Sequence, residues 1–127
     1  MTLWPFRPRP RLGRRAEILG CWFLRRQGYL LLASPYRAAR GEIDIVARDG
    51  EFLVFVEVKA RRWDPNPEDA VNPVKQQRII SAALEYRSEH PRYGPFPYRF
   101  DILAVRMHDG RDPEFSLYQN AFRVRRQ

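Results

Sequence analysis

The chain has 127 residues, and 23 Lys and Arg against 15 Asp and Glu give it a formal net charge of +8. This length favours a single domain, and 44% hydrophobic residues suffice for a packed core, which argues against wholesale disorder. One cysteine excludes an intrachain disulfide framework, and one cysteine with two histidines excludes a Cys/His zinc site. No apolar run approaches the roughly 20 residues that span a bilayer, and no secretory leader is evident, so we expect a cytoplasmic protein without a membrane partner.

The first third of the sequence predicts an arm, a helix and a strand. Three prolines lie among arginines in residues 1–11, and proline disfavours regular structure, so we expect a basic, proline-rich arm. Apolar residues then recur at helical spacing from Leu12 to Gln27, and Gly28 is a stop signal. The short apolar run from Tyr29 to Ala33 predicts a strand, and residues 36–40 predict a basic loop.

The middle of the sequence predicts a β-hairpin and a second helix. Gly41 to Ala47 and Glu51 to Lys59 are rich in Ile, Val and Phe, and the turn signal Asp49-Gly50 lies between them. We therefore expect two antiparallel strands. Prolines mark residues 60–73 as a loop, and apolar residues at helical intervals then predict a helix from Val74 to Glu89.

The last third of the sequence predicts two more strands. Tyr98 to Val105 is typical of a buried strand, Asp109-Gly110 of a turn, and Phe115 to Tyr118 of a short edge strand. A basic tail, residues 123–127, ends the chain. The predicted order, α-β-β-β-α-β-β, indicates an α/β fold in which a single mixed β-sheet is flanked by helices, formed by residues 12–122.

The predicted hairpin carries two pairs of charged residues. Because side chains alternate along a strand, Glu42 and Asp44 share one face of the first strand, and the isoleucines at positions 43 and 45 share the other. Glu57 and Lys59 share a face of the second strand for the same reason. Charges of both signs are therefore expected to meet at one place on the sheet.

This combination of charges suits a metal ion. Mg²⁺ takes oxygen ligands in near-octahedral geometry and commonly uses one or two carboxylates, a requirement that Asp44 and Glu57 meet. A nearby lysine, Lys59, can hold or activate an attacking water and stabilise developing negative charge. The alternative is that these charges form cross-strand ion pairs on a solvated sheet face.

The basic residues carry two further indications. A strong positive charge favours a polyanionic partner, with nucleic acid ahead of a membrane surface. Lysine occurs only at Lys59 and Lys75, and every other basic residue is arginine. In a chain with this preference for arginine, a retained lysine hints that its compact amine matters at that position.

Two motifs in the hairpin resemble a known family. They are Gly41-Glu42-Ile43-Asp44 and Phe55-Val56-Glu57-Val58-Lys59, and together they resemble the PD-(D/E)xK nuclease signature. The signature has this form in the YraN family of predicted bacterial endonucleases, which are related to archaeal Holliday junction resolvases. Other matching segments are Gly13 to Glu17, Gln27-Gly28-Tyr29, Lys75-Gln76, Arg99-Phe100-Asp101 and Asn120-Ala121-Phe122. The resemblance covers nearly the whole chain and implies a restriction-endonuclease-like fold.

The resemblance also implies roles for individual residues. Asp44 and Glu57 would bind Mg²⁺, with Mn²⁺ as a substitute, and the backbone carbonyl of Val58 would be a further ligand. Lys59 would be the catalytic lysine. Glu17 would complete the acidic site or bind a second ion, but the sequence allows instead a surface pair with an arginine one turn before it.

For several other polar residues, the sequence allows either a functional or a structural role. Glu42 either reaches the metal through water or pairs with a nearby arginine. Lys75 and Gln76 either bind a phosphate of the substrate or form a solvated helix start. Asp101 lies in an apolar strand, where an unpaired charge would be costly, so we expect it to be a structural partner of Arg99 or of a loop arginine rather than a metal ligand. The arginines expected to track phosphates without reading sequence lie in predicted loops and at both ends of the chain, and they are Arg37, Arg40, Arg61 and Arg62 with Arg7, Arg9, Arg11, Arg123, Arg125 and Arg126.

The implied function is that of a Mg²⁺-dependent deoxyribonuclease. The resemblance to resolvases points to branched or otherwise structured DNA in preference to RNA, and to a homodimer, because symmetrical cutting of a four-way junction needs two active sites. The alternative is a nucleic-acid-binding protein, for DNA or RNA, that has the same fold but no catalytic activity.

Overall fold

The computed structural model describes residues 12–61 and 71–124. The predicted basic arm, residues 1–11, lies outside the described residues, as do residues 62–70 and residues 125–127 of the predicted tail. Within the described part of the chain, no helix is both long enough and apolar enough to cross a membrane.

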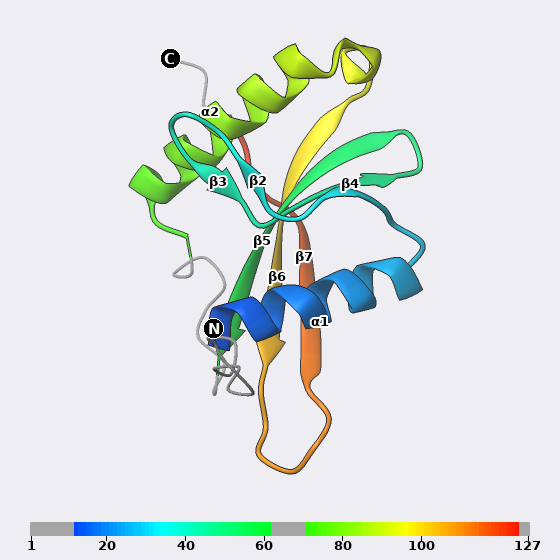
Figure 1. The fold of residues 1–127 in the computed structure, drawn as a ribbon, viewed down its shortest axis with the longest axis vertical. Coiled ribbons are helices and arrows are strands. Elements are labelled where there is room, and N and C mark those ends of the chain that lie inside the picture. The colour runs from blue at the N-terminus through cyan, green and yellow to red at the C-terminus, as the bar shows by residue number, and fades with distance from the viewer. Residues whose placement is uncertain (1–11, 62–70, 125–127) are drawn as a thin grey trace, which may run out of the picture.

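A five-stranded mixed sheet forms the centre of the fold (Figure 1). From one edge to the other, its strands are β1 (Leu30–Ala33), β4 (Ile45–Asp49), β5 (Phe52–Arg61), β6 (Tyr98–Arg106) and β7 (Glu114–Phe122). Strands β5 and β6 are parallel, and the other neighbours in the sheet are antiparallel. A separate ribbon pairs β2 (Tyr36–Arg37) with β3 (Glu42–Ile43), so part of the predicted loop at residues 36–40 is a strand.

Both long helices begin and end close to their predicted limits. Helix α1 (Leu12–Arg26) is followed by Gly28, whose φ of 93° is a left-handed conformation that glycine adopts without strain. Helix α2 (Pro73–Glu89) starts at Asn72, whose side chain accepts a hydrogen bond from the Lys75 N–H at 2.9 Å. The stop signal at Gly28 is therefore confirmed.

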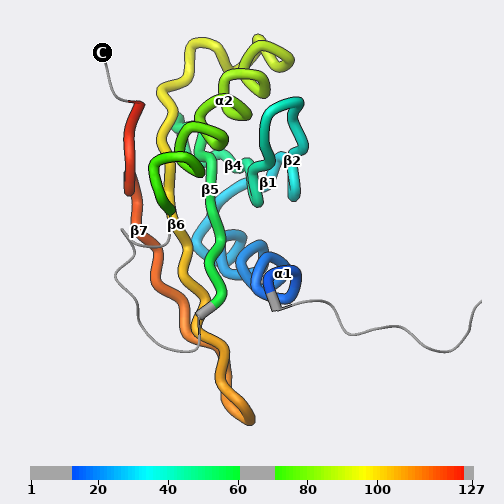
Figure 2. The backbone as a smooth tube through the Cα atoms, turned by 90° about the vertical axis from the view of Figure 1, so that its left-hand side faces the viewer, coloured from blue at the N-terminus to red at the C-terminus, as the bar shows by residue number. Residues whose placement is uncertain are grey.

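The two helices cover opposite faces of the sheet. On β5, Val54 and Val56 pack in one core cluster with Leu24 of α1, whereas Phe55 packs in another with Ile79 of α2. Figure 2 shows the helices at different levels along the strands, with α2 nearer one end of the sheet. The predicted α/β fold with a mixed sheet flanked by helices is confirmed, and it is consistent with a restriction-endonuclease-like fold.

The first strand of the predicted hairpin is divided at Asp44. Strand β3 ends at Ile43 and pairs with β2, while β4 begins at Ile45 and pairs with β1 and β5. Ile43 lies in the core cluster under α2 and Ile45 in the cluster under α1, so the prediction that they share a face is wrong. Side chains alternate regularly only along a continuous strand, and the bend at Asp44 turns the chain from the ribbon into the sheet.

The last strand is longer than predicted. The sequence predicts Phe115 to Tyr118, but β7 extends to Phe122 along the outer side of β6. Its register with β6 shifts between the pairings of Phe100 and Ile102. A short 3-10 helix, Pro91–Tyr93, connects α2 to the loop before β6.

Candidate active site

The bend at Asp44 brings this side chain beside β5. Ile45, the next residue, pairs with Val56, so Asp44 lies level with Glu57 and Val58. The Val58 N–H donates a hydrogen bond of 2.8 Å to Asp44 Oδ2, and the Asp44 side chain also shares a hydrogen bond with the Glu57 carboxyl group. The hydroxyl of Ser34 donates to the Asp44 carbonyl oxygen at 3.0 Å, which fixes the backbone at the bend. The predicted meeting of Asp44 and Glu57 is thus present in the structure.

Both lysines of the chain lie next to Glu57. Lys75 Nζ lies 2.7 Å from Glu57 Oε1, and Lys59 Nζ lies 3.9 Å from the same oxygen. Lys59 stands two residues further along β5, whereas Lys75 comes from the first turn of α2. Glu57 is only 4% exposed, so the two ammonium groups provide the positive charge that a buried carboxylate needs.

The two carboxyl groups stand close together in a poorly solvated place. Burial, followed by the negative charge of Glu57, raises the pKa of Asp44 to about 8, although the Val58 N–H acts in the opposite direction. A divalent cation between Asp44 and Glu57 would remove this repulsion. In the described part of the chain, no group of three or more His, Cys, Asp or Glu side chains is arranged to hold a metal, so the donor set here is a carboxylate pair. Two carboxylates are what Mg²⁺ commonly takes from a protein, so the residues fit this ion.

Glu17 approaches the site from α1 without joining the pair. Burial raises its pKa, the Arg14 guanidinium lowers it, and the charges of Glu42 and Glu57 raise it further. Arg14 Nη1 lies 3.6 Å from Glu17 Oε1, so the surface pair expected as the alternative is present. A role for Glu17 at the metal stays a prediction.

Glu42 lies at the rim of the site. Its carboxylate is 3.5 Å from Arg37 Nε, and both side chains are exposed, as the pairing alternative predicts. Arg40 is also exposed, whereas Arg62 and the side chain of Arg61 lie outside what the structure describes. The proposed phosphate contacts of these arginines stay predictions.

A cavity of about 520 Å³ opens in front of the carboxylate pair, and α2 forms one of its walls. Lys75 lines this cavity, whereas the Gln76 amide donates to the Val71 carbonyl at 3.0 Å and holds the chain before α2. Sequence reasoning missed two polar side chains of the lining, those of Asn72 and Arg78. The sequence Asn-Pro at a helix start signals the first as an N-cap, and the second follows Lys75 by one helical turn.

Gly41 sets the distance between the ribbon and α2. A Cβ atom at this position would lie 2.7 Å from the carbonyl oxygen of Arg78, closer than real contacts allow. The backbone before Glu42 therefore packs directly on the backbone of α2, and glycine is required for that reason. This contact positions α2 so that Lys75 reaches Glu57.

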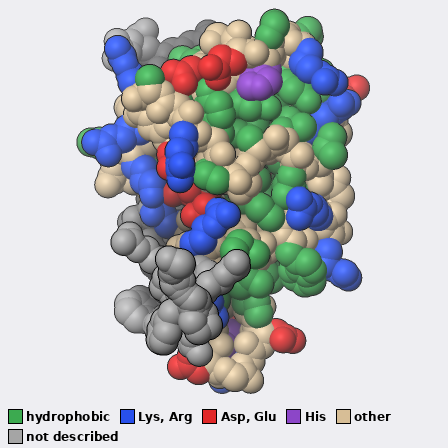
Figure 3. Space-filling model, in the orientation of Figure 1, with side chains coloured by type: hydrophobic (Ala, Val, Ile, Leu, Met, Phe, Trp, Pro, Cys, Tyr) green, Lys and Arg blue, Asp and Glu red, His purple; other side chains and the backbone are tan. Residues whose placement is uncertain are grey.

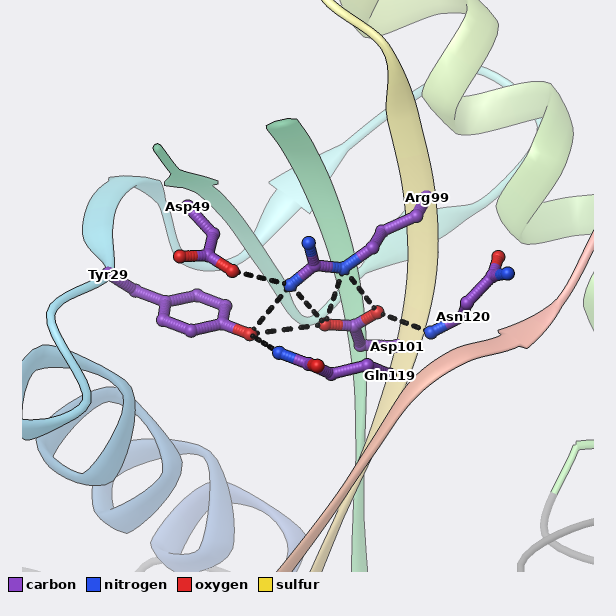
Figure 4. A network of polar contacts seen from close by, with 6 residues as sticks. All are labelled: Tyr29, Asp49, Arg99, Asp101, Gln119 and Asn120. Carbon is purple, nitrogen blue, oxygen red and sulfur yellow. Dashed lines mark hydrogen bonds and ion pairs between the residues drawn. The ribbon is translucent and has the colours of Figure 1, made fainter. Parts of the chain in front are cut away.

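Figure 4 shows a second cluster of charged residues, none of which lines this cavity. Asp101 is fully buried, and Arg99 Nε donates to its Oδ1 at 3.0 Å while Arg99 Nη2 reaches Asp49 Oδ2 at 2.8 Å. The Asn120 N–H and the Tyr29 hydroxyl also donate to the Asp101 carboxylate. The prediction that Asp101 is a structural partner of Arg99 is confirmed.

On one face of the molecule, basic side chains lie among acidic ones. Figure 3 shows this pattern on one face, where Lys and Arg side chains are interspersed with Asp and Glu rather than gathered in one continuous area.

Comparison with known proteins identifies relatives of similar length. The model of a family described as "Uncharacterised protein family UPF0102" matches residues 16–105, which include both hairpin motifs. A UPF0102 protein of Pseudomonas aeruginosa (strain LESB58) is 40% identical over 114 residues, 87% of this chain and 90% of the relative. One of Chlorobium phaeobacteroides is 44% identical over 118 residues, 87% and 93% of the two chains. One of Anaeromyxobacter dehalogenans is 39% identical over 116 residues, 90% and 85%.

Proposed function

This chain belongs to the uncharacterised protein family UPF0102, and from its candidate active site we propose that it is a metal-dependent endonuclease that hydrolyses phosphodiester bonds of DNA. One observation carries the proposal. The half-buried Asp44 and the buried Glu57 stand together beside two lysines at the edge of an open cavity. The structural cluster around Asp101 also has two carboxylates, but Arg99 lies between them, whereas Asp44 and Glu57 contact each other directly.

The metal in this proposal is Mg²⁺, with Mn²⁺ as a substitute. Asp44 and Glu57 would hold it, and the carbonyl of Val58 is the third expected ligand. When bound, the ion would acidify a water molecule and offset the charge of the phosphate in the transition state. Because Val58 also donates its N–H to Asp44, β5 itself orients both carboxylates.

The chain's own cations have separate tasks in this scheme. Lys59 stands at the end of the active strand with its ammonium group 3.9 Å from Glu57, where it would hold the attacking water and stabilise the developing negative charge. Arg78 lines the cavity from α2, and its guanidinium would donate to phosphate oxygens there. These contacts position the backbone of the substrate and read no base sequence.

Branched or otherwise structured DNA is the proposed substrate class, preferred to RNA, and the cytoplasm is the proposed location. A homodimer belongs to the same proposal, because two active sites are needed to cut a four-way junction symmetrically. Positive charge supports a nucleic-acid partner in general, and a membrane has no part in the scheme.

The test is cleavage of labelled single-stranded, duplex, flap and four-way-junction DNA in the presence of Mg²⁺, Mn²⁺ or EDTA. We expect at least one substrate to be cut with metal and none with EDTA, and Asp44→Asn and Lys59→Ala to abolish cutting. Glu114→Gln, which removes an exposed carboxylate on β7 paired with His108, is the matched control and should cut normally. Metal-independent binding without any product from the intact protein would replace the proposal by the non-catalytic alternative.

A further inference from the structure

The position of Lys75 is not explained by its expected role as a phosphate ligand. Among the described ion pairs of Glu57, the one with the Lys75 ammonium group is the shortest, at 2.7 Å. Lys59 lies on the same strand as Glu57, yet its ammonium group is 3.9 Å away. A residue whose only task was to bind substrate would point into the cavity rather than at a buried carboxylate. Lys75 therefore has a role toward Glu57 itself.

Lys75 and a metal ion would compete for the same oxygen. The ammonium group lies at hydrogen-bond distance from Glu57 Oε1, and Mg²⁺ binds carboxylate oxygens at about 2.1 Å. A metal on that oxygen would stand next to the ammonium group, and two cations at such a distance repel each other strongly in a poorly solvated place. Glu57 Oε1 can serve one of them at a time.

The geometry of α2 allows the side chain of Lys75 to leave without disturbing the fold. Its backbone N–H is fixed by the Asn72 cap, whereas its side chain is 40% exposed and lies along the cavity. A flexible four-carbon stem lets the ammonium group move by several ångströms at little cost. Arg78, one turn further along the same helix, lines the cavity into which the group would swing.

We propose that Lys75 is an exchangeable counter-ion, which neutralises Glu57 while no metal is bound and moves to a substrate phosphate when Mg²⁺ takes its place. This inference rests on the proposed function, because it needs a metal at Asp44 and Glu57. It gives Lys75 two anionic partners in succession. The free protein thereby avoids an uncompensated buried carboxylate, and the bound protein gains a phosphate donor.

A coupling between metal and DNA follows from this exchange. Without DNA, the metal must displace Lys75 from Glu57, its ion-pair partner among the described residues, so metal binding is weakened. With DNA present, a phosphate receives the displaced ammonium group, and the two ligands favour each other's binding by the same factor. Replacement of Lys75 should reduce this coupling while strengthening the binding of metal alone.

The first measurement is calorimetric titration of Mg²⁺ and Mn²⁺ into the metal-free full chain without DNA. Lys75→Gln is expected to bind the metal about tenfold more tightly than the wild type, because the competing ion pair is absent. Arg78→Gln is the matched control, since it removes a positive charge from the same helix and cavity and should change the affinity less than about twofold. Lys75→Arg keeps the charge and should keep the wild-type affinity.

The second measurement follows the side chain directly. Because the chain has only two lysines, selectively ¹³C-labelled lysine gives two side-chain signals, which Lys75→Arg assigns. In the NMR spectrum, saturating Mg²⁺ should reduce the line width of the Lys75 signal to that of a mobile side chain. Addition of an uncleavable phosphorothioate DNA should increase the line width again. A Lys75 signal that stays unchanged at metal saturation contradicts the exchange.

The outcomes separate the two proposals. If the wild type and Lys75→Gln both fail to bind Mg²⁺ and Mn²⁺, the proposed metal-dependent function fails and the counter-ion role fails with it. If the wild type binds metal but Lys75→Gln binds no more tightly than Arg78→Gln, only the counter-ion role is overturned. Thermal unfolding of each variant without metal confirms that these comparisons are made between folded proteins.

Discussion

Two neighbouring strands of the sheet carry the same simple pattern, an acid and a base two residues apart, with different results. On β6, Arg99 and Asp101 form a direct pair of 3.0 Å, and Asp101 has no exposed surface. On β5, Glu57 and Lys59 are 3.9 Å apart, and Glu57 instead contacts Lys75 from a helix. Spacing along a strand therefore does not decide whether a pair is structural.

The surroundings of the two carboxylates explain the difference. The Asp101 carboxylate accepts hydrogen bonds from a guanidinium, a backbone N–H and a hydroxyl, and no cavity adjoins it among those found in the described residues. Glu57 has a second carboxyl group beside it and a cavity in front of it. Burial of a carboxylate is common to both, so the feature that indicates chemistry is direct contact between two carboxyl groups next to a cavity.

The largest expected effect is a loss of DNA cleavage, which we expect from a change at Asp44 and not from one at Asp101. Asp44→Asn should lower the rate of DNA cleavage by about 10³-fold, because an amide binds Mg²⁺ poorly and cannot replace the carboxylate. Its oxygen can still accept the Val58 N–H, so the thermal midpoint should not fall. Cleavage rates and melting curves on the same preparation check this, and a variant that cuts normally would remove Asp44 from the site.

The next effect should appear in stability rather than in activity. Asp101→Ala leaves Arg99 without its buried partner and should lower the free energy of unfolding by about 3 kcal/mol. Urea denaturation measures the loss. Arg99→Met combined with Asp101→Ala should recover part of it, since no buried unpaired charge then remains and the carboxylate of Asp49 is partly exposed. If the double variant loses as much free energy of unfolding as the two single variants together, Arg99 and Asp101 are not coupled in this way.

A pH dependence is expected of the metal-free protein. Because the pKa of Asp44 is raised to about 8, the folded chain keeps a proton between pH 4 and pH 8 that the unfolded chain loses. Stability should therefore fall as the pH rises through this range, by about 2 kcal/mol between pH 6 and pH 8. Mg²⁺ should restore it at pH 8, and Asp44→Asn should show neither effect. Urea denaturation at pH 6 and pH 8, with and without Mg²⁺, measures these free energies of unfolding, and equal values at the two pH values would contradict the prediction.

The smallest effect concerns the rim of the site. Glu42 and Arg37 form an exposed pair of 3.5 Å, which should contribute about 0.5 kcal/mol or less to stability. A double-mutant cycle with Glu42→Gln and Arg37→Gln measures this coupling. A coupling above 1 kcal/mol would mean that Glu42, like Asp101, contributes to stability through its ion pair.

The sequence predicts a good part of the site and of the fold. The contact between Asp44 and Glu57 follows from a hairpin whose turn is marked by Asp49-Gly50, because the turn fixes the register that pairs Ile45 with Val56. Strand β5 and both helices are predicted within a few residues. Each of these results depends on local patterns.

What the sequence could not supply depends on packing between distant segments. Tyr29 and Asp101 are 72 residues apart, and nothing local indicates that they share a network. The contact of Lys75 with Glu57 requires α2 to lie against the ribbon, which is a tertiary arrangement. The bend at Asp44 breaks an otherwise regular strand pattern, and the competing pairing of β3 with β2 has no strong signal in the sequence.

The close approach at Gly41 has a consequence for attempts to alter the protein. One side of the cavity is set by a contact between two backbones, so no side chain there can be trimmed or enlarged to adjust its width. Even the smallest addition, Gly41→Ala, would push the helix outward and carry Lys75 with it. Directed changes of substrate preference should therefore begin at Val74 and Arg78, where side chains face the cavity, and leave this glycine as a fixed point of the scaffold.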